Sequence, residues 1–266
     1  MKIGVFDSGV GGLTVLRALI DRIPEADYLY LGDTARLPYG AKSRETVARY
    51  AASSAKFLVA EGAEFLVIAC NTASALALDA IRDAAPVPVL GVVETGANAA
   101  EVSSATRDVM VIATAATVES HAYAAACAAR GLRAIEKACP LLVPLVEEGW
   151  IEHPVTAEVL RIYLGELMEL AQEAKMNPDT LVLGCTHYPL LRAQIERAVP
   201  DTLRVIDSAA VTAAQVNRRL AAPRGSTEAA GTARFFATDS VVKFRALGSR
   251  FLGRAIDAVD LVDFGG

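Results

Sequence analysis

The sequence predicts an α/β protein of two similar, pseudo-symmetric domains with mostly parallel sheets and a functional site in the cleft between them. The first observation is a repeat, because the stretch 66-LVIACNTAS-74 returns later as 181-LVLGCTHYP-189. The second is composition: 53% of the residues are apolar but only 6% are aromatic, so Ala, Val and Leu must fill the core. Such cores are typical of helices packed on a buried parallel sheet. The third is length, since 266 residues suffice for two modest domains.

A strand is expected at 2–6, followed by the glycine-rich turn 7-DSGVGGL-13 and a helix whose apolar residues continue to Ile23. A strand, a glycine-rich turn and a helix form an anion-binding arrangement, because the turn exposes backbone N–H groups and the helix N-terminus adds positive potential. Asp7 and Ser8 lie in this turn, where they could bind a ligand or only cap the helix. The turn lacks the G-K-[ST] of a nucleotide-binding loop.

Further strands and helices are expected along the rest of the chain. The loop after the second strand carries the turn signal Pro38-Tyr39-Gly40, and Ser43 can cap the helix that follows. Besides the two repeats, strands are expected at 28–32, 86–93, 108–114, 203–207, 234–238 and 258–264, and helices at 44–61, 73–83, 117–130, 156–175, 190–199 and 240–252. The stretch 221-AAPRGSTEAAGT-232 is expected to be a polar loop, and the crossing into the second domain is placed at Glu94–Ala97.

Each copy of the repeat is an apolar strand that ends on a cysteine, Cys70 or Cys185. The residues that follow are Asn71 and Thr72 in the first copy and Thr186 and His187 in the second. Ligands of open α/β sheets bind at the carboxyl ends of the strands, so each copy would bring one thiol to the cleft. The alternative is two core strands that happen to end in cysteine, which is often buried.

Two thiols on opposite faces of one carbon suit racemisation or epimerisation, because one can remove a proton while the other returns one. Cysteine fits this role since its reference pKa is about 8.5 and falls near a helix N-terminus or a protonated histidine. Asp7 could steer Cys70, and His187 could assist Cys185. Either Glu147 or Glu148 could point into the cleft, although a solvated pair is the plainer interpretation.

Composition excludes several other classes. The net charge of −5, without a block of Lys or Arg, argues against a nucleic-acid partner. The four cysteines show no C-x-x-C spacing, so no metal site is expected, and Cys127 and Cys139 are interpreted as packing residues. A secretory h-region and an apolar run of spanning length are both missing, which favours a cytoplasmic protein with free thiols and no membrane partner.

Five motifs together resemble those of the glutamate racemases, in the cofactor-independent Asp/Glu racemase superfamily. They are 7-DSGVGGL-13, 32-GDTARLPYG-40, 70-CNTAS-74, 143-VPLVEEG-149 and 184-GCTHYPLL-191. The resemblance implies that Cys70 and Cys185 are the catalytic bases, with Asp7 and His187 tuning the thiols. It implies substrate binding by Asp7, Ser8, Tyr39, Gly40, Asn71, Thr72, Thr186 and His187. Asp33 and Glu147 match acidic positions with an auxiliary role.

The resemblance also implies that L- and D-glutamate are interconverted without a cofactor. The product, D-glutamate, would serve peptidoglycan and thus cell-wall biosynthesis, and the protein would be a homodimer. It places the first domain at 1–94 plus 208–266, with the tail returning to it, and the second at 95–207.

Three alternatives remain at this point. The chain could be another enzyme of the superfamily, such as an aspartate or hydantoin racemase; a one-cysteine decarboxylase is disfavoured by the cysteine pair. It could be a non-catalytic protein that binds DNA gyrase. It could be a pyridoxal-phosphate racemase, which needs a Schiff-base lysine that neither Lys42 nor Lys56 is placed to supply.

Overall fold

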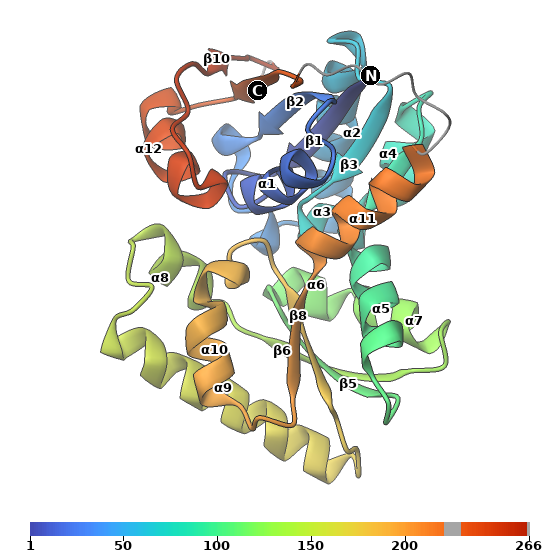
Figure 1. Cartoon of the computed structure of the whole chain (residues 1–266), viewed down its shortest axis with the longest axis vertical. Coiled ribbons are helices and arrows are strands. Elements are labelled where there is room, and N and C mark those ends of the chain that lie inside the picture. Colours follow the sequence, from blue (N-terminus) through green and yellow to red (C-terminus); the bar gives the residue numbers. More distant parts are fainter. Residues whose placement is uncertain (221–229, 265–266) are drawn as a thin grey trace. The chain divides into compact units, whose positions relative to one another are not determined.

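The computed structural model describes residues 1–220 and 230–264 and divides the chain into two compact units. The first unit contains Met1–Val92 together with the chain from Ala209 onward, and the second contains Val93–Ser208. Each unit has its own sheet with helices around it (Figure 1). The strands pair in parallel in both sheets, so the expected α/β class with mostly parallel sheets is confirmed.

The sheet of the first unit has the strand order β10-β9-β2-β1-β3-β4 among the described residues. Its strands are β1 (Lys2–Asp7), β2 (Asp27–Gly32), β3 (Phe65–Ile68), β4 (Val89–Gly91), β9 (Ala233–Ala237) and β10 (Asp260–Leu261). β1 lies inside the sheet, between β2 and β3, so it is covered on both faces and its burial is nearly continuous. β9, near the end of the chain, pairs with β2 and therefore belongs to this sheet.

Alternating side chains of these strands pack against two different sets of helices. Phe6 and Leu31 join a core with α2 (Arg44–Ala60) and α4 (Leu78–Ala84), whereas Tyr30 packs on Phe244 of α12 (Val241–Leu252). α1 (Leu13–Arg22) packs against α12 on that second face. Because neighbouring residues of a strand point to opposite faces, the two helix sets cover opposite faces of the sheet. The first unit is completed by α3 (Asn71–Leu76), α11 (Ser208–Leu220) and the 3₁₀ turns η1 (Thr34–Arg36) and η2 (Tyr39–Ala41).

The sheet of the second unit has the order β6-β5-β7-β8. Its strands are β5 (Asp108–Ala113), β6 (Arg133–Ala138), β7 (Thr180–Gly184) and β8 (Arg204–Asp207). The helices are α5 (Val92–Ser103), α6 (Ala115–Glu119), α7 (Ala122–Ala128), α8 (Leu142–Glu147), α9 (Pro154–Glu173), η3 (Tyr188–Leu191) and α10 (Arg192–Ala198). The inner strands β5 and β7 are buried at every position, which explains their unbroken apolar sequence.

Several expected boundaries were wrong. The stretch 86–93 is not one strand, because β4 ends at Gly91 and α5 begins at Val92. A side chain at position 91 would lie 2.4 Å from the Ser74 hydroxyl, so only glycine allows this close packing. The helix expected at 117–130 is two helices separated by His121, whose φ of 54° interrupts helical geometry.

The helix expected at 73–83 is likewise two, α3 and α4, which meet at Ala77. The helix expected at 190–199 is η3 followed by α10, and the strand expected at 258–264 shortens to β10. β6 was missed because its sequence, RAIEKA, is half-buried and lacks an apolar run. Of the polar loop expected at 221–232, residues 221–229 lie outside the described residues.

Candidate active site

The carboxyl edge of the first sheet gathers three of the residues singled out from the sequence. Asp7 is the last residue of β1, Asp33 follows β2, and Cys70 lies two residues after β3. The backbone ties them together: the Asp33 N–H donates to the Asp7 carbonyl at 3.0 Å, and the Cys70 N–H donates to the Phe6 carbonyl at 3.4 Å. Parallel pairing thus places the three side chains at adjacent strand ends, where α/β proteins bind ligands.

Cys70 is the N-cap of α3, and its sulfur accepts a hydrogen bond from the Ala73 N–H at 3.4 Å. The thiol also donates to the Ser8 hydroxyl at 3.5 Å. Burial, and then the negative charge of Asp7, raise the pKa of Cys70 to about 12, although both hydrogen bonds act in the opposite direction. Asn71 and Thr72 form the buried first turn of α3 directly beside it.

Asp7 does not cap α1, which corrects one of the two interpretations of the glycine-rich turn. α1 begins at Leu13, and its N-cap is Gly12, which has no side chain to serve as a cap. One Asp7 carboxylate oxygen accepts from the Gly9 N–H at 2.8 Å instead, inside the turn. A side chain at Gly12 would lie 2.6 Å from the Asp7 Cβ, so this glycine gives the Asp7 carboxylate its room.

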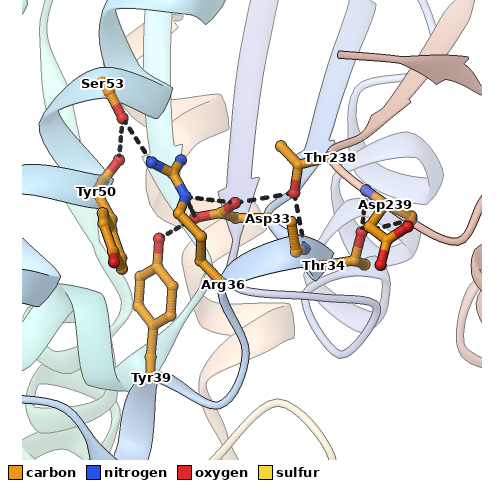
Figure 2. Close-up of polar contacts among 9 residues, drawn as sticks. Asp33, Thr34, Arg36, Tyr39, Tyr50, Ser53, Thr238 and Asp239 are labelled. Atoms are coloured by element: carbon orange, nitrogen blue, oxygen red, sulfur yellow. Dashed lines mark hydrogen bonds and ion pairs between the residues drawn. The ribbon is translucent and has the colours of Figure 1, made fainter. Parts of the chain in front are cut away.

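Tyr39 and Gly40 lie in η2, within the loop that follows β2. The Tyr39 side chain is buried, and its hydroxyl donates to the Asp33 carboxylate (Figure 2). Burial, and then the Asp33 charge, raise the pKa of Tyr39, so the phenol stays protonated. Tyr39 is therefore one of several donors to the Asp33 carboxylate.

The carboxyl edge of the second sheet carries the other thiol. Cys185 follows β7 directly, as Cys139 follows β6, and the Cys139 N–H donates to the carbonyl of Ala113 at 2.9 Å. The Cys185 sulfur lies 3.9 Å from Nδ1 of His187, whose Nε2 lies 3.2 Å from a carboxylate oxygen of Glu147. Of the two glutamates considered from the sequence, Glu147 makes this contact with His187, whereas Glu148 is exposed.

The three residues form a chain of thiol, imidazole and carboxylate. Burial alone would lower the pKa of His187, but the contacts with Cys185 and Glu147 outweigh it and raise the pKa to about 10. Both contacts favour the protonated imidazolium of His187. Thr186, also buried, has its hydroxyl 3.4 Å from the same Nδ1 atom.

The remaining candidates are structural. Cys127 and Cys139 are buried in the second unit, and burial raises their pKa values to about 11 and about 12. The Cys139 carbonyl accepts a hydrogen bond from the Tyr188 hydroxyl at 2.9 Å, so this cysteine helps to anchor the turn after Cys185. Asp207, which echoes Asp7 in sequence, pairs with Arg192 at 2.8 Å.

Within residues 1–220 and 230–264, no group of three or more His, Cys, Asp and Glu side chains is arranged to hold a metal ion. In the same part of the chain, every helix is too short or too polar to cross a membrane.

Each strand end can thus perform proton chemistry at a thiol. Cys70 has a hydroxyl, a backbone N–H and the Asp7 carboxylate around it, and Cys185 has an imidazolium supported by a carboxylate. A thiol that gives up a proton beside a cation, or a thiolate that takes one up beside a carboxylate, suits general acid–base catalysis.

Comparison with known proteins identifies the class. The family described as Asp/Glu/Hydantoin racemase matches residues 11–216, and the chain belongs to this family. It is 53% identical to the glutamate racemase of Koribacter versatilis over 99% of this chain and 98% of that protein. These matches confirm the family resemblance of the five motifs.

Solved structures of glutamate racemases also match this chain. The crystal structure of glutamate racemase from Thermus thermophilus in complex with β-chloro-D-alanine matches with a TM-score of 0.86 and 43% identity, over 99% of this chain and 97% of that one. Glutamate racemase from Francisella tularensis in complex with D-glutamate matches with a TM-score of 0.86 and 33% identity, over 98% of this chain and 97% of that one.

Proposed function

We propose that this protein is a glutamate racemase that interconverts L- and D-glutamate by proton transfer at the α-carbon. The observation that carries the proposal is the paired arrangement of a strand, a cysteine and a proton-managing partner. Cys70 has Asp7 beside it, and Cys185 has His187. The names of the similar proteins support glutamate as the substrate.

In this proposal the thiols of Cys70 and Cys185 act on opposite faces of the α-carbon of a single glutamate. One sulfur, as thiolate, removes the α-proton, and the other, as thiol, delivers a proton to the opposite face. The roles exchange in the reverse direction. The high pKa of free Cys70 means that it begins as the thiol, so binding of the substrate ammonium would supply the positive charge that favours its thiolate.

The remaining site residues hold the substrate or set protonation states. The proposed substrate-binding residues are Asp7, Ser8, Tyr39, Gly40, Asn71, Thr72, Thr186 and His187. Glu147 supports the imidazolium of His187, with which it is in contact. The carbanion would be stabilised by these fixed donors, without a cofactor.

The proposed biological role is the supply of D-glutamate for peptidoglycan, and hence for cell-wall biogenesis and cell shape. We further propose a cytoplasmic homodimer in which residues 1–94 plus 208–266 and residues 95–207 act as two domains. Nucleic acid and membrane are not proposed as partners.

A racemisation assay tests the proposal. The purified protein, with chelator and without added cofactor, is incubated with L-glutamate, D-glutamate and L-aspartate, and the optical rotation is followed. Rotation should decay with both glutamates. Activity on aspartate alone would reassign the substrate within the family, and inactivity on every amino acid would favour a non-catalytic role such as gyrase binding.

Cysteine variants test the site. Cys70→Ala and Cys185→Ala should each abolish racemisation in both directions, because each direction needs one thiolate and one thiol. The matched controls Cys127→Ala and Cys139→Ala should stay within a few-fold of the parent protein, since both residues are packing residues. Normal racemisation by Cys70→Ala would end the two-thiol scheme.

A further inference from the structure

Asp33 is a fully buried carboxylate with donors from two distant parts of the chain. Arg36 Nε lies 2.9 and 2.8 Å from its two oxygens, the Thr238 hydroxyl donates to it at 2.9 Å, and the Tyr39 hydroxyl donates to the second oxygen. A buried charge is costly unless such donors saturate it. Figure 2 shows the donors converging on Asp33 from the loop and from the chain after β9.

Thr238 and Asp239 fasten the start of this loop to the end of β9. The Ala35 N–H donates to the Thr238 hydroxyl at 2.9 Å, so that hydroxyl both accepts from the loop and donates to Asp33. The Thr34 hydroxyl donates to the Asp239 carbonyl at 2.6 Å and accepts from the Asp239 N–H at 2.9 Å. The loop is therefore bonded to a segment about two hundred residues away in the chain.

Arg36 is fixed on its far side as well. Its Nη1 donates to the Ser53 hydroxyl at 3.3 Å, and the Ser53 hydroxyl donates to the Tyr50 carbonyl at 2.8 Å. The guanidinium lies over the Tyr50 ring at 4.4 Å and over the Phe264 ring at 4.9 Å. Contacts of this kind lock a long side chain into one rotamer, so Arg36 can hold the Asp33 carboxylate in one orientation.

We propose that Thr238 and Arg36 are positioning residues that act through Asp33 to fix the Tyr39 hydroxyl, and with it the Tyr39–Gly40 segment that binds substrate. This inference rests on the proposed function for the role of Tyr39 and Gly40. Because Thr238 and Arg36 orient the Asp33 carboxylate, the Tyr39 hydroxyl that donates to it is held in one position. Fixing a binding segment in advance lowers the free energy lost when ligand binds, so the consequence belongs in KM rather than in kcat.

The test is Thr238→Val, which keeps the shape of the side chain and removes both bonds of its hydroxyl. KM for glutamate should rise about 10-fold, the typical worth of one hydrogen bond to a charged group, with kcat within about 2-fold. Thr238→Ser retains the hydroxyl and should restore KM.

The matched control is Thr232→Val, which removes another Thr–Asp hydrogen bond, from Thr232 to Asp27 at 2.7 Å, at the other end of β9. It should leave KM unchanged. An equal rise of KM in both variants would overturn the proposal, because the effect would then be general loosening of β9.

A double-mutant cycle with Tyr39→Phe tests the route through Asp33. In the Tyr39→Phe background, Thr238→Val should have almost no further effect on KM, because the hydroxyl that it positions is already gone. Additive effects would show that Thr238 acts by another route and would contradict the proposal.

An activity-free measurement separates this inference from the proposed function. Hydrogen exchange of the amides at 34–42 should be faster in Thr238→Val, but not in Thr232→Val, because local opening depends on the bonds that close the loop. An inactive parent protein would remove the proposed function while this readout still decides the positioning role. Unchanged exchange in Thr238→Val would overturn it.

Discussion

At the scale of single residues, the Asp7 carboxylate influences the protonation of the Cys70 thiol. Asp7 raises the pKa of the Cys70 thiol by its negative charge, second only to burial. One oxygen of the same carboxylate accepts a hydrogen bond from the Gly9 N–H at 2.8 Å, which orients the side chain. Burial and the charge of Asp7 thus keep the Cys70 thiol protonated in the free protein, and in the proposed mechanism Asp7 also attracts the substrate ammonium.

The prediction for Asp7 follows from removal of this charge. Asp7→Asn keeps the shape, and it should lower the pKa of Cys70, so alkylation of Cys70 should begin at a lower pH than in the parent protein. The substitution should lower kcat for racemisation more than it raises KM. The fall in kcat should lie within about 10²–10⁴-fold, the range that general acid–base groups provide. Mass spectrometry of alkylated peptides and steady-state kinetics measure the two effects. A lower melting temperature without a kinetic loss would return Asp7 to a structural role.

The residue scale is also where sequence reasoning performed best and where it stopped. The repeat placed Cys70 and Cys185 after buried strands, and both lie there. Asp33 was recognised only through the family resemblance, because its partners Thr238 and Arg36 share no pattern with it in sequence. A bond between residues 33 and 238 depends on the pairing of β2 with β9, which no local periodicity encodes.

At the scale of elements, strands with an unbroken apolar run were predicted correctly, whereas a strand without such a run was missed. The unbroken apolar run of β7 predicted a buried central strand, whereas the charged edge strand β6 left no such signal. Val-rich residues after Pro88 favoured a long strand, but the close approach of Gly91 to Ser74 ends β4 there. Tertiary packing thus decided boundaries that local preference left ambiguous.

The contact between His187 and Glu147 joins two elements, the end of α8 and the turn that opens η3, and it makes a prediction about stability. Against the effect of burial, the contacts with Cys185, and then with Glu147, raise the pKa of His187 from 6.5 to about 10, so the folded state binds this proton more tightly. The resulting stabilisation is complete below pH 6.5 and disappears as pH rises through about 10.

Glu147→Gln should therefore lower the free energy of unfolding by about 2 kcal/mol at mildly acidic pH, the worth of a charge-assisted hydrogen bond, and by progressively less towards alkaline pH. Urea unfolding of both proteins across this range measures the difference. The matched control is the exposed neighbour Glu148→Gln, which should change little at any pH. A Glu147→Gln difference that is constant with pH would contradict a protonated His187.

At the scale of the whole molecule, each unit contains an α/β sheet with one of the two repeat cysteines, Cys70 or Cys185, just after the carboxyl end of a strand. The sequence repeat predicted two similar domains, since each copy was expected to form the end of a strand in its own sheet. It could not foretell that β9 joins the first sheet, because that pairing connects segments about two hundred residues apart. The division of the two thiols between two units sets a demand on the reaction, which an isotope experiment can test.

If the two thiols act as separate bases, the group that delivers a proton is not the group that removed one. The delivering thiol equilibrates with solvent while the site is empty. In D₂O, starting from L-glutamate, early D-glutamate should therefore carry deuterium at the α-carbon. The remaining L-glutamate should stay almost wholly protiated, because a thiol holds a single proton and returns the one it took.

A single base with several protons, such as a lysine serving both faces, would behave differently. It would scramble solvent deuterium into recovered substrate and would carry some original proton across to product. NMR of both enantiomers at low conversion distinguishes the two schemes directly. Substantial deuterium in recovered L-glutamate, before much D-glutamate has formed, would exclude Cys70 and Cys185 as opposed bases, because neither thiol alone can exchange the proton it holds for a solvent deuteron while substrate is bound.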